Sequence, residues 1–123
     1  MLIENTLRMP YTELTVGGTV YMLRLTALSA ARLEERIGMS VYKAVENADK
    51  VSVAAELLYA LIEGLRPEFT KRETFEVIDG FIGEGGTLPE LGIVIAGALR
   101  NSGFFGEASP RQASSFAGCT EKQ

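Results

Sequence analysis

The segment VSVAAELLYALIEGL, residues Val51 to Leu65, is the most apolar long stretch of the chain. Only Glu56 and Glu63 carry charge within it. A helix that is apolar nearly all round has no face suited to water, so it lies centrally in a core or against a partner. The helix should stop at Arg66-Pro67, because the residue before a proline disfavours helical geometry. The segment therefore predicts a helix that other elements, or a partner, must cover.

The segment YTELTVGGTVYMLRL, residues Tyr11 to Leu25, predicts a β-hairpin. Two runs rich in Thr, Val and Tyr flank Gly17-Gly18, and such a pair supplies the positive φ angles of a tight turn. The alternation after the turn places Tyr21, Leu23 and Leu25 on one buried face. Since an isolated hairpin is only marginally stable in water, we expect it to pack on helices.

The remaining helices are indicated by their start and stop signals. Ser or Thr before an apolar run caps a helix, and Glu three residues later completes a capping box. Glycine ends a helix in left-handed geometry. The expected segments are Thr26 (cap) to Gly38 (stop), Val41 to Glu46, Thr70 to Gly83 with the box Thr70/Glu73, and Thr87 to Ser102 with the box Thr87/Glu90. Their expected apolar stripes are Leu28, Ala31, Leu33 and Ile37 in the first, Phe75, Ile78 and Ile82 with Val77 and Phe81 as further candidates in the third, and Leu88, Leu91, Ile93, Val94, Ile95 and Leu99 in the last.

These elements predict an α+β, mainly α fold, in which an N-terminal β-hairpin packs on a small bundle of about four to five helices. The chain has 123 residues, enough for one domain with one core. We expect residues 1–105 to form this single helical domain. Residues 106–123, rich in Ser, Ala, Gly and polar side chains, are expected to form a disordered, flexible tail.

Composition argues against several classes of function. There are 16 acidic and 12 basic residues, a net charge of −4, and no basic cluster, which disfavours nucleic-acid binding. The chain has no His and a single Cys, Cys119, so the commonest general base and the usual zinc ligand sets are missing. Leu91 to Leu99, the longest uncharged helical run, is far shorter than the about 20 residues that span a bilayer. We expect a cytoplasmic protein that is not an enzyme and has no cofactor, metal or membrane partner.

The segment IDGFIGEGGTLPEL, residues Ile78 to Leu91, has the outline of a calcium-binding EF-hand loop. Asp79 and Glu90 are first and twelfth in a twelve-residue window. However, Phe81 stands at position three, where calcium needs an oxygen, and Glu84 stands at position six, where the loop needs glycine. We therefore expect a helix-loop-helix corner in which Glu90 belongs to a capping box.

The last predicted helix, LPELGIVIAGAL, allows two interpretations. It is a buried core helix, or part of its apolar face meets another apolar helix. Phe104 and Phe105 favour the second, because two adjacent rings after a helix stop are hard to bury together in a small chain. The candidate protein-interface residues are Tyr59, Leu91, Ile95, Leu99, Phe104 and Phe105.

The order of elements resembles the tail assembly chaperones of long-tailed bacteriophages and of related prophages in Gram-positive bacteria. The matching cues are a hairpin that leads into LRLT, an amphipathic LEERIG helix, a hydrophobic-Asp pair followed by Gly-Gly and Leu-x-x-Leu, and a closing Ser-Gly-Phe-Phe. The resemblance covers Tyr11 to Phe105 and includes no catalytic signature.

The resemblance implies a helper in the host cytoplasm during tail morphogenesis that is absent from the finished virion. Many copies coat the tape measure protein, keep it soluble and help to recruit tail tube subunits. In many of these phages a ribosomal frameshift makes a longer form that engages the tail tube protein; this chain would be the shorter form. Self-association into a homo-oligomer stays open. The alternative is a helical protein-protein adaptor or regulatory module of another bacterial system.

Overall fold

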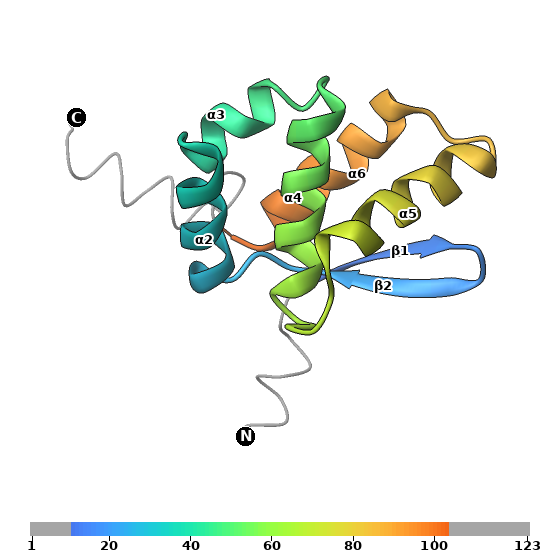
Figure 1. Cartoon of the computed structure of the whole chain (residues 1–123), viewed down its shortest axis with the longest axis horizontal. Coiled ribbons are helices and arrows are strands. Elements are labelled where there is room, and N and C mark those ends of the chain that lie inside the picture. Colours follow the sequence, from blue (N-terminus) through green and yellow to red (C-terminus); the bar gives the residue numbers. More distant parts are fainter. Residues whose placement is uncertain (1–10, 104–123) are drawn as a thin grey trace.

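The computed structural model describes residues 11–103, in which two strands precede five helices (Figure 1). The α+β, mainly helical class expected from the sequence is confirmed. The expected tail, residues 106–123, lies outside the described residues. The elements are β1 (Thr12–Val16), β2 (Thr19–Leu23), α2 (Ala27–Ile37), α3 (Val41–Glu46), α4 (Val51–Glu63), α5 (Lys71–Gly83) and α6 (Leu88–Asn101).

The hairpin forms as the Gly-Gly pair predicts. Gly17 and Gly18 have φ angles of 60° and 80°, which suit a two-residue turn between twisted strands. β1 and β2 pair antiparallel, and this register places Leu14, Val16 and Leu23 on one buried face. The hairpin therefore offers a single apolar face to the helices.

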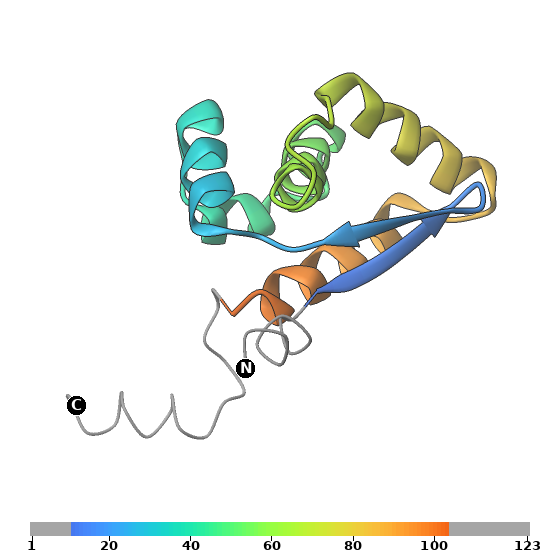
Figure 2. The same cartoon turned by 90° about the horizontal axis from the view of Figure 1, so that it is seen from below.

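Helix α4 is the centre of the molecule. It contacts α2, α3, α5, α6 and β2. Figure 2 shows it nearly end-on, with α2 on one side, α5 on the other, and α6 and the hairpin beneath. The sequence left open whether this helix lies in the core or against a partner. The structure places it in the core, because other elements of the chain cover its apolar surface. Its fully buried side chains are Ala54, Ala55, Leu57, Leu58, Ala60, Leu61 and Ile62.

The three predicted threonine caps are confirmed. Thr70 and Thr87 each accept a hydrogen bond from the backbone N–H of Glu73 and Glu90, and both glutamates accept one in return from the threonine N–H. Thr26 forms the same reciprocal arrangement with a serine, Ser29. Short-range signals of this kind need no tertiary partner, so the sequence alone locates them.

The predicted inward faces of two helices are partly wrong. On α2, Leu28 and Ala31 are exposed, and the core side consists of Ser29, Ala30 and Leu33. Ser29 can be buried because the capping box satisfies its hydroxyl group. Leu28 is consequently 60% exposed.

On α5, the buried side chains are Thr74, Val77 and Ile78, whereas Phe75 and Ile82 are exposed. The Thr74 hydroxyl donates to the Thr70 carbonyl oxygen at 3.2 Å, which removes the cost of burying it. The prediction from hydrophobicity is therefore right for Val77 and Ile78 and wrong for Phe75 and Ile82.

The link between the hairpin and α2 is fastened to the ends of two other helices. The Arg24 N–H donates to the Leu61 carbonyl of α4 at 2.9 Å. The Leu25 N–H donates to the Ser102 hydroxyl, just after α6, at 2.8 Å. This close approach requires Gly64, because a Cβ atom there would lie 2.7 Å from the Arg24 carbonyl oxygen.

We predict that Gly64→Ala lowers the free energy of unfolding by about 1–3 kcal/mol, because backbone atoms must move to admit the methyl group. Gly83→Ala is the matched control, since a Cβ atom at Gly83 meets nothing within 4 Å. This control should leave stability unchanged or raise it by about 0.5 kcal/mol. Urea denaturation of both variants measures the difference, and equal stabilities would contradict the close approach.

Candidate functional site: an apolar groove beside helix α6

A groove of about 360 Å³ lies between the α3–α4 joint and the outer side of α6. It is near the upper end of α4 in Figure 1. Asp49 is the one ionisable side chain in its lining, so the groove offers a ligand mainly apolar surface. The lining residues are Val45, Ala48, Asp49, Leu88, Pro89, Gly92, Ile93, Ile95 and Ala96.

Helix α6 supplies most of the groove because it has two apolar faces. One faces the core and contains its buried side chains, including Leu91 and Leu99. The other carries the small residues Gly92 and Ala96 beside Ile93, which is 71% exposed. Isoleucine on a face of small side chains exposes apolar surface that a second helix could approach closely.

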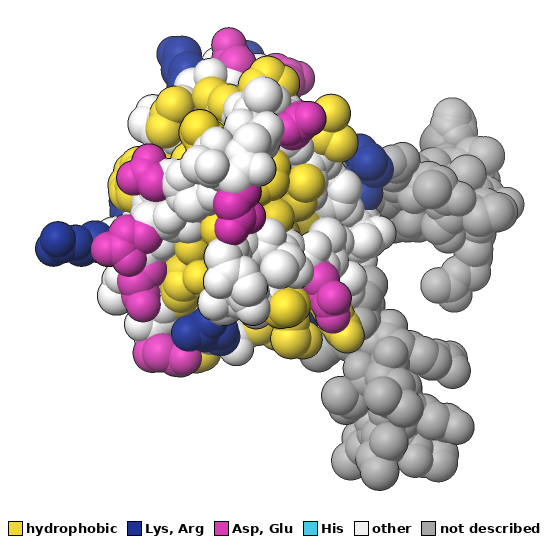
Figure 3. Space-filling model, turned by 90° about the vertical axis from the view of Figure 1, so that its right-hand side faces the viewer, with side chains coloured by type: hydrophobic (Ala, Val, Ile, Leu, Met, Phe, Trp, Pro, Cys, Tyr) yellow, Lys and Arg dark blue, Asp and Glu magenta, His cyan; other side chains and the backbone are white. Residues whose placement is uncertain are grey.

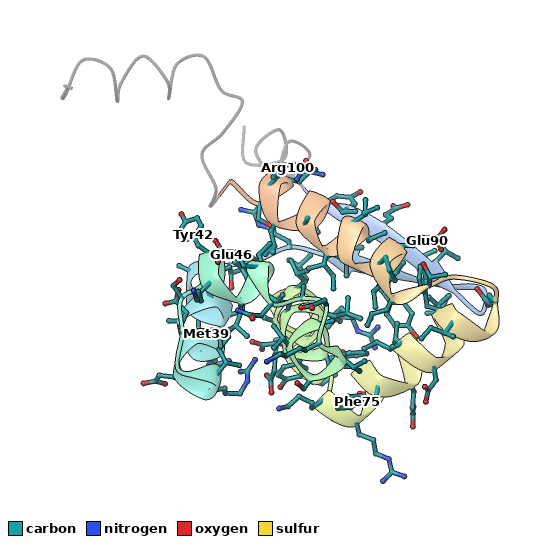
Figure 4. The ribbon with its side chains drawn as sticks, turned by 90° about the horizontal axis from the view of Figure 1, so that it is seen from above. Met39, Tyr42, Glu46, Phe75, Glu90 and Arg100 are labelled. Atoms are coloured by element: carbon teal, nitrogen blue, oxygen red, sulfur yellow. The ribbon has the colours of Figure 1, made fainter. Side chains whose placement is uncertain are left out.

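Acidic side chains lie in the groove lining and on two helices, α3 and α6, that help to form it. Asp49 belongs to its lining. Glu46 lies on α3 and Glu90 in the first turn of α6 (Figure 4). Glu46 forms a 3.8 Å ion pair with Lys43, whereas Glu90 accepts the capping hydrogen bond from the Thr87 N–H. In Figure 3, Asp and Glu likewise stand between hydrophobic patches on the side where α5 meets α6.

Three of the predicted interface residues are core residues. Leu91, Ile95 and Leu99 are buried, because the hairpin and α4 cover that side of α6. Their assignment to a partner-facing surface is therefore corrected, although Ile95 also lines the groove. Tyr59 is half-buried, with the Arg36 guanidinium 4.9 Å from its ring centroid. The last two predicted residues, Phe104 and Phe105, lie outside the described residues.

Sequence reasoning missed Val45, Ala48, Pro89 and Ile93 as groove residues. A usable signal was present for two of them. Pro89, Gly92, Ile93 and Ala96 recur at the helical spacing i, i+3, i+4, i+7, which marks a face distinct from the buried one. Val45 and Ala48 carry no comparable signal, because only the packing of α3 against α4 brings them near α6.

The segment with the EF-hand outline is a corner between α5 and α6. Asp79 is exposed on α5, and Glu90 takes part in the α6 capping box. Within residues 11–103, no three His, Cys, Asp or Glu residues are grouped so that they could hold a metal ion. In the same range, no helix is both long and apolar enough to cross a membrane.

Comparisons with protein-family models, with curated proteins and with solved structures each found no match to this chain.

The half-buried carboxylate of Glu56, on α4, connects this helix to α2 and α5. Arg36 of α2 donates to Oε1 at 2.9 Å, and Lys71 of α5 donates to Oε2. Burial raises the pKa of the Glu56 carboxyl, but the hydrogen bonds and positive charges of Lys71 and Arg36 outweigh it, so the pKa lies below its ordinary value. The charged form is therefore the one that the folded state favours.

We predict that Glu56→Gln lowers the free energy of unfolding by about 1–2 kcal/mol at neutral pH. Because the folded pKa is depressed, this stabilisation is present above the unfolded-chain pKa and is lost as the pH falls through the folded pKa. Urea denaturation as a function of pH should show the two proteins converging in acid. Glu68→Gln is the control, because Glu68 is exposed and its pair with Arg66 is loose at 3.4 Å. A constant difference at every pH would contradict the assignment.

Proposed function

We propose that this chain is a bacteriophage or prophage tail assembly chaperone that binds the tape measure protein and keeps it soluble. The observation that supports this most directly is the groove beside α6, with Ile93 exposed at its edge. A tape measure protein is a long helical chain whose apolar faces stay uncovered before assembly. A groove that receives one apolar helix face provides the cover that such a client needs.

The geometry suits a helix that lies along α6. The side chains of Gly92 and Ala96 are small, so a client backbone can approach this side of α6 closely. Ile93 then packs between client side chains spaced one helical turn apart, while Val45 and Leu88 contact their flanks. Anchors at i, i+3 or i+4, and i+7 are the pattern that a groove of this kind recognises.

Charge indicates which helices bind best. The acidic side chain in the groove lining, Asp49, favours a client helix whose apolar stripe is flanked by Lys or Arg. Pairs at a solvent-exposed rim are screened by salt, so they steer the client more than they hold it. A small groove with a screened rim supports weak, reversible contact, repeated by many copies along one client.

In this proposal the protein acts in the cytoplasm of the bacterial host and leaves before the tail is finished. Recruitment of the tail tube protein belongs to a longer, frameshifted form. If the groove instead binds a helix of a protein that has no role in tail assembly, the chain is a protein-protein adaptor.

Co-expression with a tape measure protein from the same genome tests the proposal. The wild-type chain should raise the soluble fraction of the tape measure protein and co-purify with it. Ile93→Asp should weaken this binding by about tenfold or more, because a charge replaces the central apolar contact. Circular dichroism should show an unchanged fold, since the Ile93 side chain is mostly exposed.

Ile82→Asp is the matched control, because it makes the same substitution at another exposed isoleucine, on α5 and outside the lining of the groove. It should leave the solubility of the tape measure protein unchanged. If the wild-type chain fails to solubilise that protein, the chaperone proposal is wrong. If both variants behave alike, the binding surface is not the groove.

A further inference from the structure

A second hollow, of about 270 Å³, lies at the other end of α4, where the C-terminus of that helix meets the first turns of α2. Its walls include the apolar side chains of Leu28 and Pro67, and Arg32 and Glu63 supply its charges. It is separate from the groove beside α6, because α4 is 13 residues long and places its two ends about 20 Å apart. The residues lining it are Thr26, Leu28, Ser29, Arg32, Glu63, Gly64 and Pro67.

The carboxylate of Glu63 is buried without enough partners. Glu63 is 6% exposed, and within residues 11–103 its Oε2 atom has no hydrogen-bond partner. Its Oε1 atom lies 3.6 Å from Nη1 of Arg32, which is longer than a hydrogen bond, and the Arg32 side chain is half exposed. A buried carboxylate with one loose ion pair is an incompletely satisfied anion.

The surrounding backbone adds to the negative potential. Glu63 is the last residue of α4, where the helix dipole places partial negative charge. No basic side chain lies in the last turn of α4. Arg66, the nearest cation downstream, pairs with Glu68 and lies over the Phe69 ring, 5.5 Å from its centroid. Among residues 11–103, Arg32 is the basic residue that lines the hollow with Glu63, and its ion pair with the carboxylate is long at 3.6 Å.

We propose that this hollow binds an organic cation: an ammonium or guanidinium group at the end of an unbranched alkyl chain. The charged end would pair with the Glu63 carboxylate, and the methylene groups would lie between Leu28 and Pro67. Arg32 is exposed enough to swing aside and give up its loose contact. This chemistry is carried both by Lys or Arg side chains of a partner polypeptide and by free small amines.

The test is a titration of the ¹⁵N-labelled full chain with n-butylammonium chloride, followed by amide chemical shifts. The amides of Thr26, Ser29 and Gly64 should shift and saturate, with a Kd of about 1–10 mM, as expected for a ligand of so few atoms. Sodium chloride at the same ionic strength and neutral n-pentanol should not reproduce the shifts. Identical shifts with either control would overturn the proposal, as would no shift at all.

Two variants separate a binding site from a structural hollow. Glu63→Gln keeps the shape and removes the charge, so affinity should fall about tenfold or more. Arg32→Ala removes the competing cation from an exposed position, so affinity should rise; an unaffected or weaker affinity would count against the proposal. Since Arg32 is exposed, this variant stays informative even if Glu63→Gln does not fold.

A final arm distinguishes the two sources of the cation. The blocked tripeptide acetyl-Gly-Lys-Gly-amide presents a lysine side chain without a free terminus. Binding at least as tight as that of n-butylammonium assigns the site to a polypeptide side chain. Binding of the free amine alone assigns it to a small molecule.

Discussion

The fold depends on the need to cover the broad apolar face of helix α4. Its seven fully buried apolar side chains occupy more than half of the helix circumference, and the half-buried Glu56 and Tyr59 lie on the remainder. Exposing the apolar side chains would be unfavourable at roughly 25 cal/mol for each Å² of apolar surface, far more than the few kcal/mol that stabilise a small domain. The remaining elements are accordingly arranged around α4: α2 and α3, α5, α6, and strand β2 each contact it.

Covering α4 brings elements together that are distant in the chain, and polar contacts then fix their positions. Arg24 and Leu25 attach the end of the hairpin to α4 and to the residue after α6. Glu56 connects α2 and α5 across α4. Each contact supplies a hydrogen-bond partner to a polar group that packing would otherwise bury without one. The polar contacts therefore select one arrangement of the helices among several that bury similar apolar area.

The features that could be predicted from the sequence are those decided within a few residues. The Gly17-Gly18 turn, the capping threonines and the uniformly apolar α4 belong to this class. The inward faces of α2, α5 and α6 are harder to predict from the sequence, because each helix has more apolar residues than one face can hold. On α5, buried Thr74 and exposed Phe75 reverse the order of hydrophobicity, since an internal hydrogen bond lets the threonine enter the core. Groove residues such as Ala48 depend on how separate helices meet, which no local pattern encodes.

Both candidate sites lie where the covering of α4 ends, and its termini differ from those of the other helices. α2, α3, α5 and α6 begin with Ser or Thr side-chain caps, whereas the N-cap residue of α4, Lys50, makes no capping hydrogen bond and α4 ends at a glutamate. Burial stabilises α4 strongly enough that its ends need not be optimised for stability. Residues at those ends can therefore carry exposed apolar surface or an incompletely paired carboxylate without unfolding the chain. The central helix can thus carry a candidate site at each of its ends because its stability comes from its middle.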